Sequence, residues 1–403
     1  MAIVTAIPPN LITNLPKVFF QGAKIHNPRT NKFERNNLGI IDGKIEYIGN
    51  ERPAFFIEGN VKVVDDCYIS SGWIDLHTHY FGCWGENMDP NLHGLLKGAT
   101  LQVDAGSAGM KTIQDFIEGV VKKTDGRLII MENIASEGLA KRTGENKLLT
   151  CHNAIETAEK AIQYKDFVKM IKIRIGKTQS TDGSWKKALL MAKEAARLAG
   201  GLPVMVHIED GVHLKQIMEM LGEGDIITHA FRRDGNCSIL DSNYRLKPYV
   251  KDFLKRGGRL DVGHGAGGFH KENAEAAIAI FLELLANEHY KLYSTSTDLH
   301  CFSLDKLAKS LPDVMSKMVS LGATREDIVS SVTKVPAESL GLPASRWRMH
   351  KGDTANLTIW DHEESEHKVH TFRDPHKTVW KGREMFKPKM VYVNGQLIEI
   401  PEN

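Results

Sequence analysis

Short apolar runs alternate with amphipathic stretches through most of the middle of the chain. The apolar runs are rich in β-branched residues and are too short for helices, which predicts buried strands. In the stretches between them, apolar residues recur at helical spacing. Eight strands are expected at 73–76, 100–104, 128–132, 170–175, 204–208, 226–229, 259–262 and 291–295. Helices are expected at 112–123, 154–164, 185–198, 211–221, 244–256 and 274–287.

Strands that alternate with helices in this way predict an α/β fold, a (β/α)₈ TIM barrel over residues 70–349. Barrels of this kind carry their active sites at the C-terminal ends of the strands. Residues capable of chemistry should therefore gather where the predicted strands end.

The two ends of the chain have a different pattern of short strands and tight turns. Residues 18–20 lead to Gly22, which we interpret as a turn, and a hairpin is expected around Asp42-Gly43-Lys44. Strands are also expected at 356–360 and at 390–393, before an Asn-Gly turn. Neither end is long enough to bury a core alone. We therefore expect a small β-sandwich domain built from both chain termini, residues 1–69 plus 350–403.

Composition narrows the class of protein. The 403 residues are 42% apolar and 25% charged, as in a folded globular protein, and 52 basic against 50 acidic residues leave a net charge of +2. This charge argues against a nucleic-acid or membrane-surface partner, and no apolar run is long enough to span a bilayer. Residues 1–16 contain no basic side chain and no convincing cleavage site, so no signal peptide is expected.

The five cysteines are scattered, and none forms a CxxC pair. This usage is typical of a reduced, cytoplasmic protein and excludes a thiolate zinc site. Any bound metal must therefore be held by some of the 17 histidines.

Histidines stand where several predicted barrel strands end. His77 and His79 are two residues apart, so both face the barrel axis. His207 ends the fifth predicted strand and His229 the sixth. An HxH pair can arise by chance, and a lone histidine at a strand end is more often a hydrogen-bonded core residue. Four imidazoles at one level of the barrel favour a divalent metal site.

Two further strands carry charged residues. The eighth predicted strand is followed by Asp298, whose carboxylate could bind a metal and move a proton. The fourth places Lys172 and Arg174 on one face, although a barrel strand should be almost wholly apolar. Arg174 can extend to the barrel rim. Deep burial of Lys172 would lower its pKa and leave an amine that can add carbon dioxide, giving a carboxylate able to bridge two metals.

This set of residues, in this order, resembles the ligand set of the binuclear amidohydrolase superfamily. The segments IIDGKIEYIG, GWIDLHTHY and KGDTANLTIWD also resemble that superfamily. The segments KGATLQVDAGSAG, IKIRIGK, DVGHGAGGF and STSTDLH resemble its amidohydrolase/deacetylase subgroup. That subgroup is similar to dihydroorotases and N-acyl-amino-acid deacylases and includes members that cleave small acetyl esters.

The resemblance implies two divalent metal ions, with zinc favoured by the ligand types. His77, His79 and Asp298 would hold one ion, His207 and His229 the other, and a carboxylated Lys172 would bridge them. A hydroxide shared by the metals would attack an acyl amide or ester, with Asp298 transferring the proton. The implied activity is that of a deacetylase or deacylase acting on a small N-acetyl or O-acetyl substrate.

Substrate contacts are predicted at several positions. Arg174 suits a substrate carboxylate, although an ion pair with an acid at the barrel rim is an equal alternative. After the seventh strand, His264 could bond to a substrate oxygen, and Gly265 would let the backbone approach the ligand. Tyr80 and Ser107 also follow strand ends and are further candidates.

Other functions compete with the deacylase. A cyclic-amide hydrolase of the dihydroorotase or hydantoinase type would use the same metals. A mononuclear nucleobase deaminase would have no use for Lys172, and a non-catalytic scaffold on the same fold should have lost ligands. The expected partner is a small molecule, and the outer helices of such a barrel would also allow a homo-oligomer.

Overall fold

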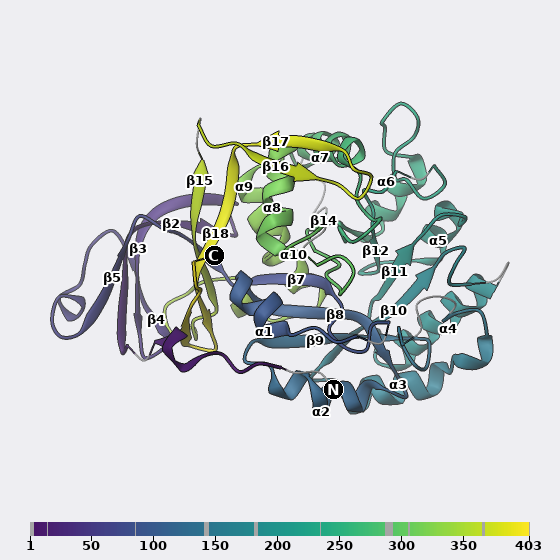
Figure 1. The fold of residues 1–403 in the computed structure, drawn as a ribbon, viewed down its shortest axis with the longest axis horizontal. Helices are drawn as coiled ribbons and strands as arrows, with labels where there is room; N and C mark the ends of the chain where they lie inside the picture. Colours follow the sequence, from purple (N-terminus) through teal and green to yellow (C-terminus); the bar gives the residue numbers. More distant parts are fainter. Residues whose placement is uncertain are drawn as a thin grey trace.

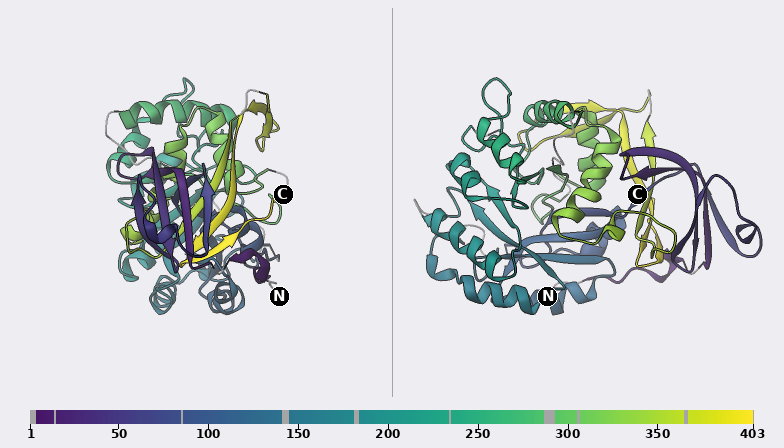
Figure 2. Two further views of the ribbon diagram at one scale, coloured as in Figure 1. Left: turned by 90° about the vertical axis from the view of Figure 1, so that its left-hand side faces the viewer. Right: turned by 180° about the vertical axis from the view of Figure 1, so that it is seen from behind.

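A computed structural model describes residues 4–13, 15–84, 86–140, 145–180, 184–233, 235–286, 293–304, 307–364 and 367–402. A barrel of parallel strands forms one part of the molecule, and a large mixed sheet lies beside it (Figures 1 and 2).

Within the described residues, eight parallel strands form the barrel sheet in chain order, β7 to β14. A parallel bridge between Thr78 and Leu299 joins the first strand to the segment after the last, so the barrel is nearly closed. The eight predicted strands are confirmed. They are β7 (Trp73–Thr78), β8 (Ala99–Gly109), β9 (Arg127–Asn133), β10 (Val168–Ile175), β11 (Val204–Ile208), β12 (Ile226–Thr228), β13 (Arg259–Asp261) and β14 (Tyr293–Ser294).

Helices cover the outside of the barrel (Figure 1). The six predicted helices are present, and α8 to α10 follow the last strand without having been predicted. The α-helices are α1 (Pro90–His93), α2 (Ile113–Gly119), α3 (Ala154–Gln163), α4 (Ser184–Leu198), α5 (Leu214–Met220), α6 (Pro248–Lys255), α7 (Lys271–Ala286), α8 (Leu311–Ser320), α9 (Arg325–Ser331) and α10 (Lys334–Ser339). Short 3₁₀ turns are η1 (Pro9–Leu11), η2 (Ala54–Phe56), η3 (Leu95–Lys97), η4 (Val121–Lys123), η5 (Leu149–Cys151) and η6 (Ala344–Arg346).

The predicted ends at 287 and 291–292 lie outside the described residues. Helix α6 begins at Pro248, four positions later than predicted, because residues 244–247 belong to a loop and proline suits the first turn. No helix of the described part is long and apolar enough to cross a membrane.

Strand β10 has the two faces expected of it. Met170 points into the barrel and belongs to the same core cluster as Met131 and Met205 of the neighbouring strands. Ile171 and Ile173 belong instead to the layer between the strands and the outer helices. Because side chains alternate along a strand, Lys172 must share the inner face with Met170.

Both ends of the chain contribute to the second sheet, as predicted. In the described part, nine strands take the order β1-β19-β18-β15-β6-β2-β3-β4, with β5 beside β2, and β16 and β17 form a separate ribbon. The strands are β1 (Ile12–Thr13), β2 (Lys17–Asn27), β3 (Lys32–Ile41), β4 (Lys44–Gly49), β5 (Val61–Asp65), β6 (Tyr68–Ser71), β15 (Leu357–Glu364), β16 (His370–Arg373), β17 (Val379–Gly382), β18 (Glu384–Val393) and β19 (Gln396–Glu399).

The sheet folds back on itself around an apolar core. The Ile45 N–H donates to the Asp353 carbonyl at 2.9 Å, and the Ala355 N–H donates to the Gly43 carbonyl at 2.8 Å. These bonds bring the β3–β4 hairpin against the segment that precedes β15. The enclosed core gives the small β layer its stability.

The backbone φ angles show which of the turns predicted in this sheet are present. Asp42 and Gly43 have φ of 46° and 73°, and Asn394 and Gly395 have 50° and 86°, so both predicted hairpin turns are confirmed. The turn predicted at Gly22 is wrong. Strand β2 continues through Gly22, whose φ of 62° accommodates a β-bulge against β3.

Aromatic rings fill the junction between the sheet and the barrel. Trp73 of β7 and Trp360 of β15 are fully buried, with ring centroids 5.2 Å apart, and Phe386 of β18 lies 6.1 Å from Trp73. His362 of β15 has its side chain buried near this junction, where its ring lies 5.0 Å from that of Phe386. Its side chain is 1% exposed, and its Nε2 lies 2.7 Å from a Glu384 carboxylate oxygen.

Candidate metal centre and active site

A cavity of about 370 Å³ lies at the C-terminal ends of the barrel strands. Several predicted site residues line it, and they come from five barrel strands or from the segments that follow them. They are His77, His79, Lys172, Arg174, His207, His229 and Asp298. The structure therefore brings together the six predicted metal ligands and Arg174, which come from chain positions more than 200 residues apart.

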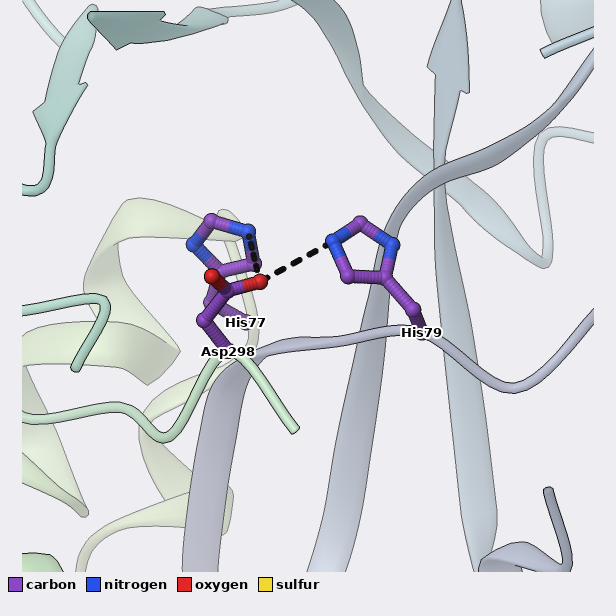
Figure 3. A group of neighbouring side chains, drawn as sticks. All are labelled: His77, His79 and Asp298. Atoms are coloured by element: carbon purple, nitrogen blue, oxygen red, sulfur yellow. Dashed lines mark ion pairs between the residues drawn. The ribbon is translucent and has the colours of Figure 1, made fainter. Parts of the chain in front are cut away.

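Asp298 lies between His77 of β7 and His79, which follows that strand. Its Oδ1 lies 3.3 Å from His77 Nε2 and 3.1 Å from His79 Nε2 (Figure 3). The candidate ligand atoms of these three buried residues all lie within 4.8 Å of one another. This spacing suits one divalent ion bound by two imidazoles and a carboxylate.

The backbone around Asp298 is specialised. Asp298 has a φ of 48°, in the left-handed region that aspartate tolerates better than most residues, and its N–H donates to the His77 carbonyl at 2.7 Å. A Cβ added to Gly265 would lie 2.0 Å from Asp298 Oδ2. Glycine at 265 is therefore needed so that the loop after β13 can pack against this carboxylate.

His207 and His229 form a second pair of converging nitrogens. His207 Nδ1 lies 2.7 Å from His229 Nε2, and His229 Nδ1 lies 2.6 Å from the Gly263 carbonyl oxygen. Since a carbonyl only accepts, His229 Nδ1 must carry the proton, and the lone pair on its Nε2 faces His207 Nδ1. The donor atoms of these two rings thus point at the same space.

Lys172 lies beneath the histidines and is fully buried. Its Nζ is 3.2 Å from His77 Nε2 and 3.3 Å from Met205 Sδ. Burial lowers the pKa of this amine to about 7, so a large part is uncharged at neutral pH. A Cβ on Gly106 would lie 2.6 Å from Lys172 Cγ, so glycine makes room for the lysine stem.

Arg174 forms the ion pair considered for it and also faces the cavity, whereas its contact with a substrate carboxylate stays a prediction. It lines the cavity and is 8% exposed, and its Nε lies 3.4 Å from a carboxylate oxygen of Glu145. Among the described residues, its Nε and Nη1 have no hydrogen-bond partner within bonding geometry. A buried guanidinium with unsatisfied donors at a cavity wall is suited to an anionic ligand.

The other predicted substrate contacts lie behind the wall formed by the described residues. The His264 ring is buried and stacks on Phe269, with Nε2 lying 3.4 Å from Lys317 Nζ. Tyr80 is 1% exposed, and Ser107 bonds to His79 Nδ1. Gly265 contacts Asp298, as described above. The structure therefore places these residues around the ligands instead of on the cavity surface.

The sequence reading missed the aromatic side of the cavity. Trp84, from the loop after β7, packs edge-on against His300 with ring centroids 4.7 Å apart, and Phe302 lies 5.3 Å from Trp84. All three line the cavity. Only His300 had a clue in the sequence, the D-L-H triplet that includes Asp298; Trp84 and Phe302 stand in loops without a repeating pattern.

The donor set fits a divalent metal. Burial lowers the pKa of His77, His207 and His229, for His229 to about 3, so these imidazoles are neutral at pH 7 and can offer lone pairs. Asp298 contributes a carboxylate. Neutral imidazoles with a carboxylate are ligands that zinc and other first-row metals accept.

Sequence comparison relates the chain to known hydrolases. The sequence profile described as "Amidohydrolase family" matches residues 68–398. A deacetylase of Agrobacterium fabrum is 29% identical over 364 residues, which cover 89% of this chain and 85% of the relative. A deacetylase of Brucella anthropi is 29% identical over 406 residues, covering 97% and 92%.

Solved structures agree on the architecture. A dihydroorotase superimposes with a TM-score of 0.82 at 27% identity, covering 95% of this chain and 99% of its own. An adenine deaminase gives the same TM-score and coverage at 25% identity. Similar folds thus occur in a dihydroorotase and in an adenine deaminase, so the site residues must distinguish between possible reactions.

Proposed function

Because the chain belongs to the amidohydrolase family, we propose that it is a metal-dependent deacetylase of small N-acetyl or O-acetyl compounds that bear a carboxylate. Relatives named deacetylases match along most of the chain. The observation that carries the proposal is the convergence of four imidazoles, Asp298 and Lys172 on one cavity beside an arginine with unsatisfied donors.

We propose that the site takes two divalent metals, with zinc favoured by the ligand types. His77, His79 and Asp298 would hold one, and His207 and His229 the other. Lys172, once carboxylated by carbon dioxide, would contact both. When bound, such ions supply Lewis acidity, which polarises a carbonyl oxygen and lowers the pKa of water.

The side chains of this protein would do the remaining work. Asp298 faces the cavity, and in the proposed reaction its carboxylate takes a proton from the attacking water and delivers it to the leaving nitrogen or oxygen. Arg174 would hold the substrate carboxylate through its unsatisfied N–H groups, and this contact would orient the acyl group toward the metals. Trp84 and Phe302 offer an apolar wall for a substrate side chain.

A turnover screen on metal-loaded protein tests the proposal. We expect release of acetate from N-acetyl amino acids or O-acetyl hydroxy acids, with matched D and L forms revealing the preferred configuration. The methyl ester of each acid serves as the control without a carboxylate and should react more slowly. Turnover of none of the acetyl compounds would refute the deacetylase.

The structural likeness to a dihydroorotase supports a second candidate, hydrolysis of a cyclic amide. Dihydroorotate, hydantoins and other cyclic ureides therefore belong in the same screen. Ring opening of one of them, in the absence of acetate release, would favour this alternative over the deacetylase.

A further inference from the structure

Two buried hydroxyl groups lie between the histidines of the HxH motif, His77 and His79, and two buried carboxyl groups. Thr228 Oγ1, at the end of β12, lies 2.9 Å from His77 Nδ1 and donates to Asp261 Oδ2 at 2.7 Å. The direct distance from His77 Nδ1 to that oxygen is 3.6 Å, too long for a hydrogen bond. The threonine hydroxyl thus spans a gap that the carboxylate itself does not close.

His79 has the same arrangement on its other side. Ser107 Oγ lies 3.0 Å from His79 Nδ1, and the Ser107 hydroxyl also bonds to Asp104. Asp104 accepts the Tyr80 N–H at 2.7 Å and the Ser107 N–H at 2.8 Å. Backbone N–H groups only donate, so these bonds occupy both carboxylate oxygens as acceptors.

Asp261 is an acceptor as well. Besides Thr228, the hydroxyls of Ser294 and Ser296 donate to it at 2.5 and 2.8 Å, and the residue is fully buried. Burial raises the pKa of Asp261, and its three convergent hydroxyl donors oppose that shift and fix the position of the carboxyl group.

We infer that Thr228 and Ser107 are positioning residues that set the tautomer and the orientation of His77 and His79 for metal binding. Each hydroxyl donates its own proton to an aspartate oxygen, so it must accept the proton on Nδ1 of the histidine. Nε2 of each ring is left unprotonated, and in both rings it is the atom that lies beside Asp298. Two hydrogen-bond relays therefore hold the imidazoles of the HxH motif. In each relay the histidine Nδ1–H donates to a hydroxyl, which donates to a carboxyl group: His77 to Thr228 to Asp261, and His79 to Ser107 to Asp104.

This inference rests on the proposed metal site, and its test separates the two. Thr228→Val removes the hydroxyl at nearly constant volume, and Thr228→Ser restores it. Thr78→Val is the matched control, because Thr78 lies between the two histidines and its buried hydroxyl donates to the Val103 carbonyl instead of to a ring. Ser107→Ala tests the second relay independently.

The first measurement is zinc affinity, by competition with a chromophoric chelator. Thr228→Val and Ser107→Ala should each weaken zinc binding roughly 10- to 100-fold. Thr228→Ser and Thr78→Val should bind as the parent does. Equal affinity for Thr228→Val and the parent, or an equal loss in Thr78→Val, would overturn the inference while leaving the metal site intact.

The second measurement needs no metal. In metal-free protein labelled with ¹⁵N-histidine, long-range ¹H–¹⁵N spectra distinguish the two tautomers of each ring. We expect the Nδ1–H signal of His77 to change in Thr228→Val and that of His79 to change in Ser107→Ala. Both signals should persist in Thr78→Val. Rings protonated at Nε2 in the parent would refute the relays. Failure of the parent to bind zinc would count against the proposed function alone.

Discussion

Lys172 lies in surroundings that differ sharply from those that its side chain prefers. A lysine ammonium is strongly hydrated in water, yet this one is fully buried, and burial lowers its pKa to about 7. A free amine at this position can react with carbon dioxide, and the product is a carboxylate beside His77. The proposed bridging role follows from this environment.

We expect Lys172→Ala to lose metal and activity together. Removal of a shared ligand should lower kcat/KM by roughly 100-fold or more and reduce the bound metal, as measured by elemental analysis. Short carboxylic acids such as formate or propionate should restore part of the activity by filling the space. Lys169→Ala, on the same strand but with its amine at the Lys165 carbonyl, is the control and should behave as the parent. Full metal content and turnover in Lys172→Ala would show that the bridge is wrong.

Arg174 should determine preference for charged substrates. Arg174→Met keeps most of the apolar stem and removes the hydrogen-bond donors. It should weaken the binding of a carboxylate-bearing substrate by about 2 kcal/mol, which corresponds to a KM raised roughly 30-fold. The KM of the corresponding methyl ester should change little. Steady-state kinetics on both compounds checks this, and equal losses on both would assign Arg174 a structural role through Glu145.

Glu132 makes stability depend on pH. Its carboxyl group on β9 is fully buried, and neither oxygen has a hydrogen-bond partner among the described residues. Burial raises the pKa of this group from 4.5 to about 9. The unfolded chain releases the proton above about pH 4.5, whereas the folded protein keeps it up to about pH 9. Since the folded state binds more protons in this window, stability falls as pH rises through it.

Glu132→Gln should remove this pH dependence. Relative to the parent, its free energy of unfolding should rise with pH by up to about 1.4 kcal/mol per unit between pH 5.5 and 8. Urea unfolding at the two pH values measures the difference. Glu159→Gln on the exposed side of α3 is the control and should leave the slope unchanged. If the free energies of unfolding of Glu132→Gln and the parent changed in parallel with pH, Glu132 would be ionised in the folded protein.

At the scale of elements, the loop after β13 shapes the site through its glycines. A Cβ at Gly265 would meet Asp298 Oδ2, whereas a Cβ at Gly267 would meet nothing within 4 Å. We therefore expect Gly265→Ala to lose most metal binding and activity, and Gly267→Ala to keep both. Chelator competition and kinetics on the two variants decide this. Equal tolerance would mean that the loop shifts easily, so that Gly265 does not constrain Asp298.

The elements that were predicted best from the sequence are those with a local pattern of residues that is specific to one structure. Lys172 and Arg174 could be placed on the inner face of β10 because alternation along a strand determines which side chains share a face. The Asp-Gly and Asn-Gly hairpins were predicted because those dipeptides suit positive φ. Gly22 was misread because a bulge and a turn both use glycine at positive φ, and pairing with a neighbouring strand distinguishes them.

From the sequence, the site could be predicted only at positions that follow directly from the order of the barrel strands. Six candidate ligands could be chosen because barrel strands end at one face. The contact of Glu145 with Arg174 depends on how a loop approaches the barrel, and the contact of Thr228 with His77 joins two strands that are not neighbours in the sheet. No local sequence pattern predicts either approach. His264, in the glycine-rich loop after β13, packs on Phe269, and its contact with a substrate stays a prediction.

At the scale of the whole molecule, the aromatic junction couples the sheet to the barrel. Trp360 is fully buried, and its ring lies close to Trp73 and to Phe386. Trp360→Ala should lower the free energy of unfolding by about 3–5 kcal/mol through the cavity it leaves. Zinc affinity below the unfolding temperature should remain that of the parent, because the junction is separate from the cavity residues. Calorimetry and chelator competition test both parts, and a large loss of zinc affinity would show that the junction also shapes the site.

The contact that closes the barrel also determines when the site can exist. The Asp298 N–H bonds to the His77 carbonyl, and Thr78 pairs with Leu299, so the first and last barrel strands meet at the cavity. A ribosome adds roughly 5–20 residues per second, so His77 is made tens of seconds before Asp298. A nascent chain that stops short of β14 carries the histidines but has no closed centre, and the ability to bind substrate arrives only when synthesis of the barrel is nearly complete.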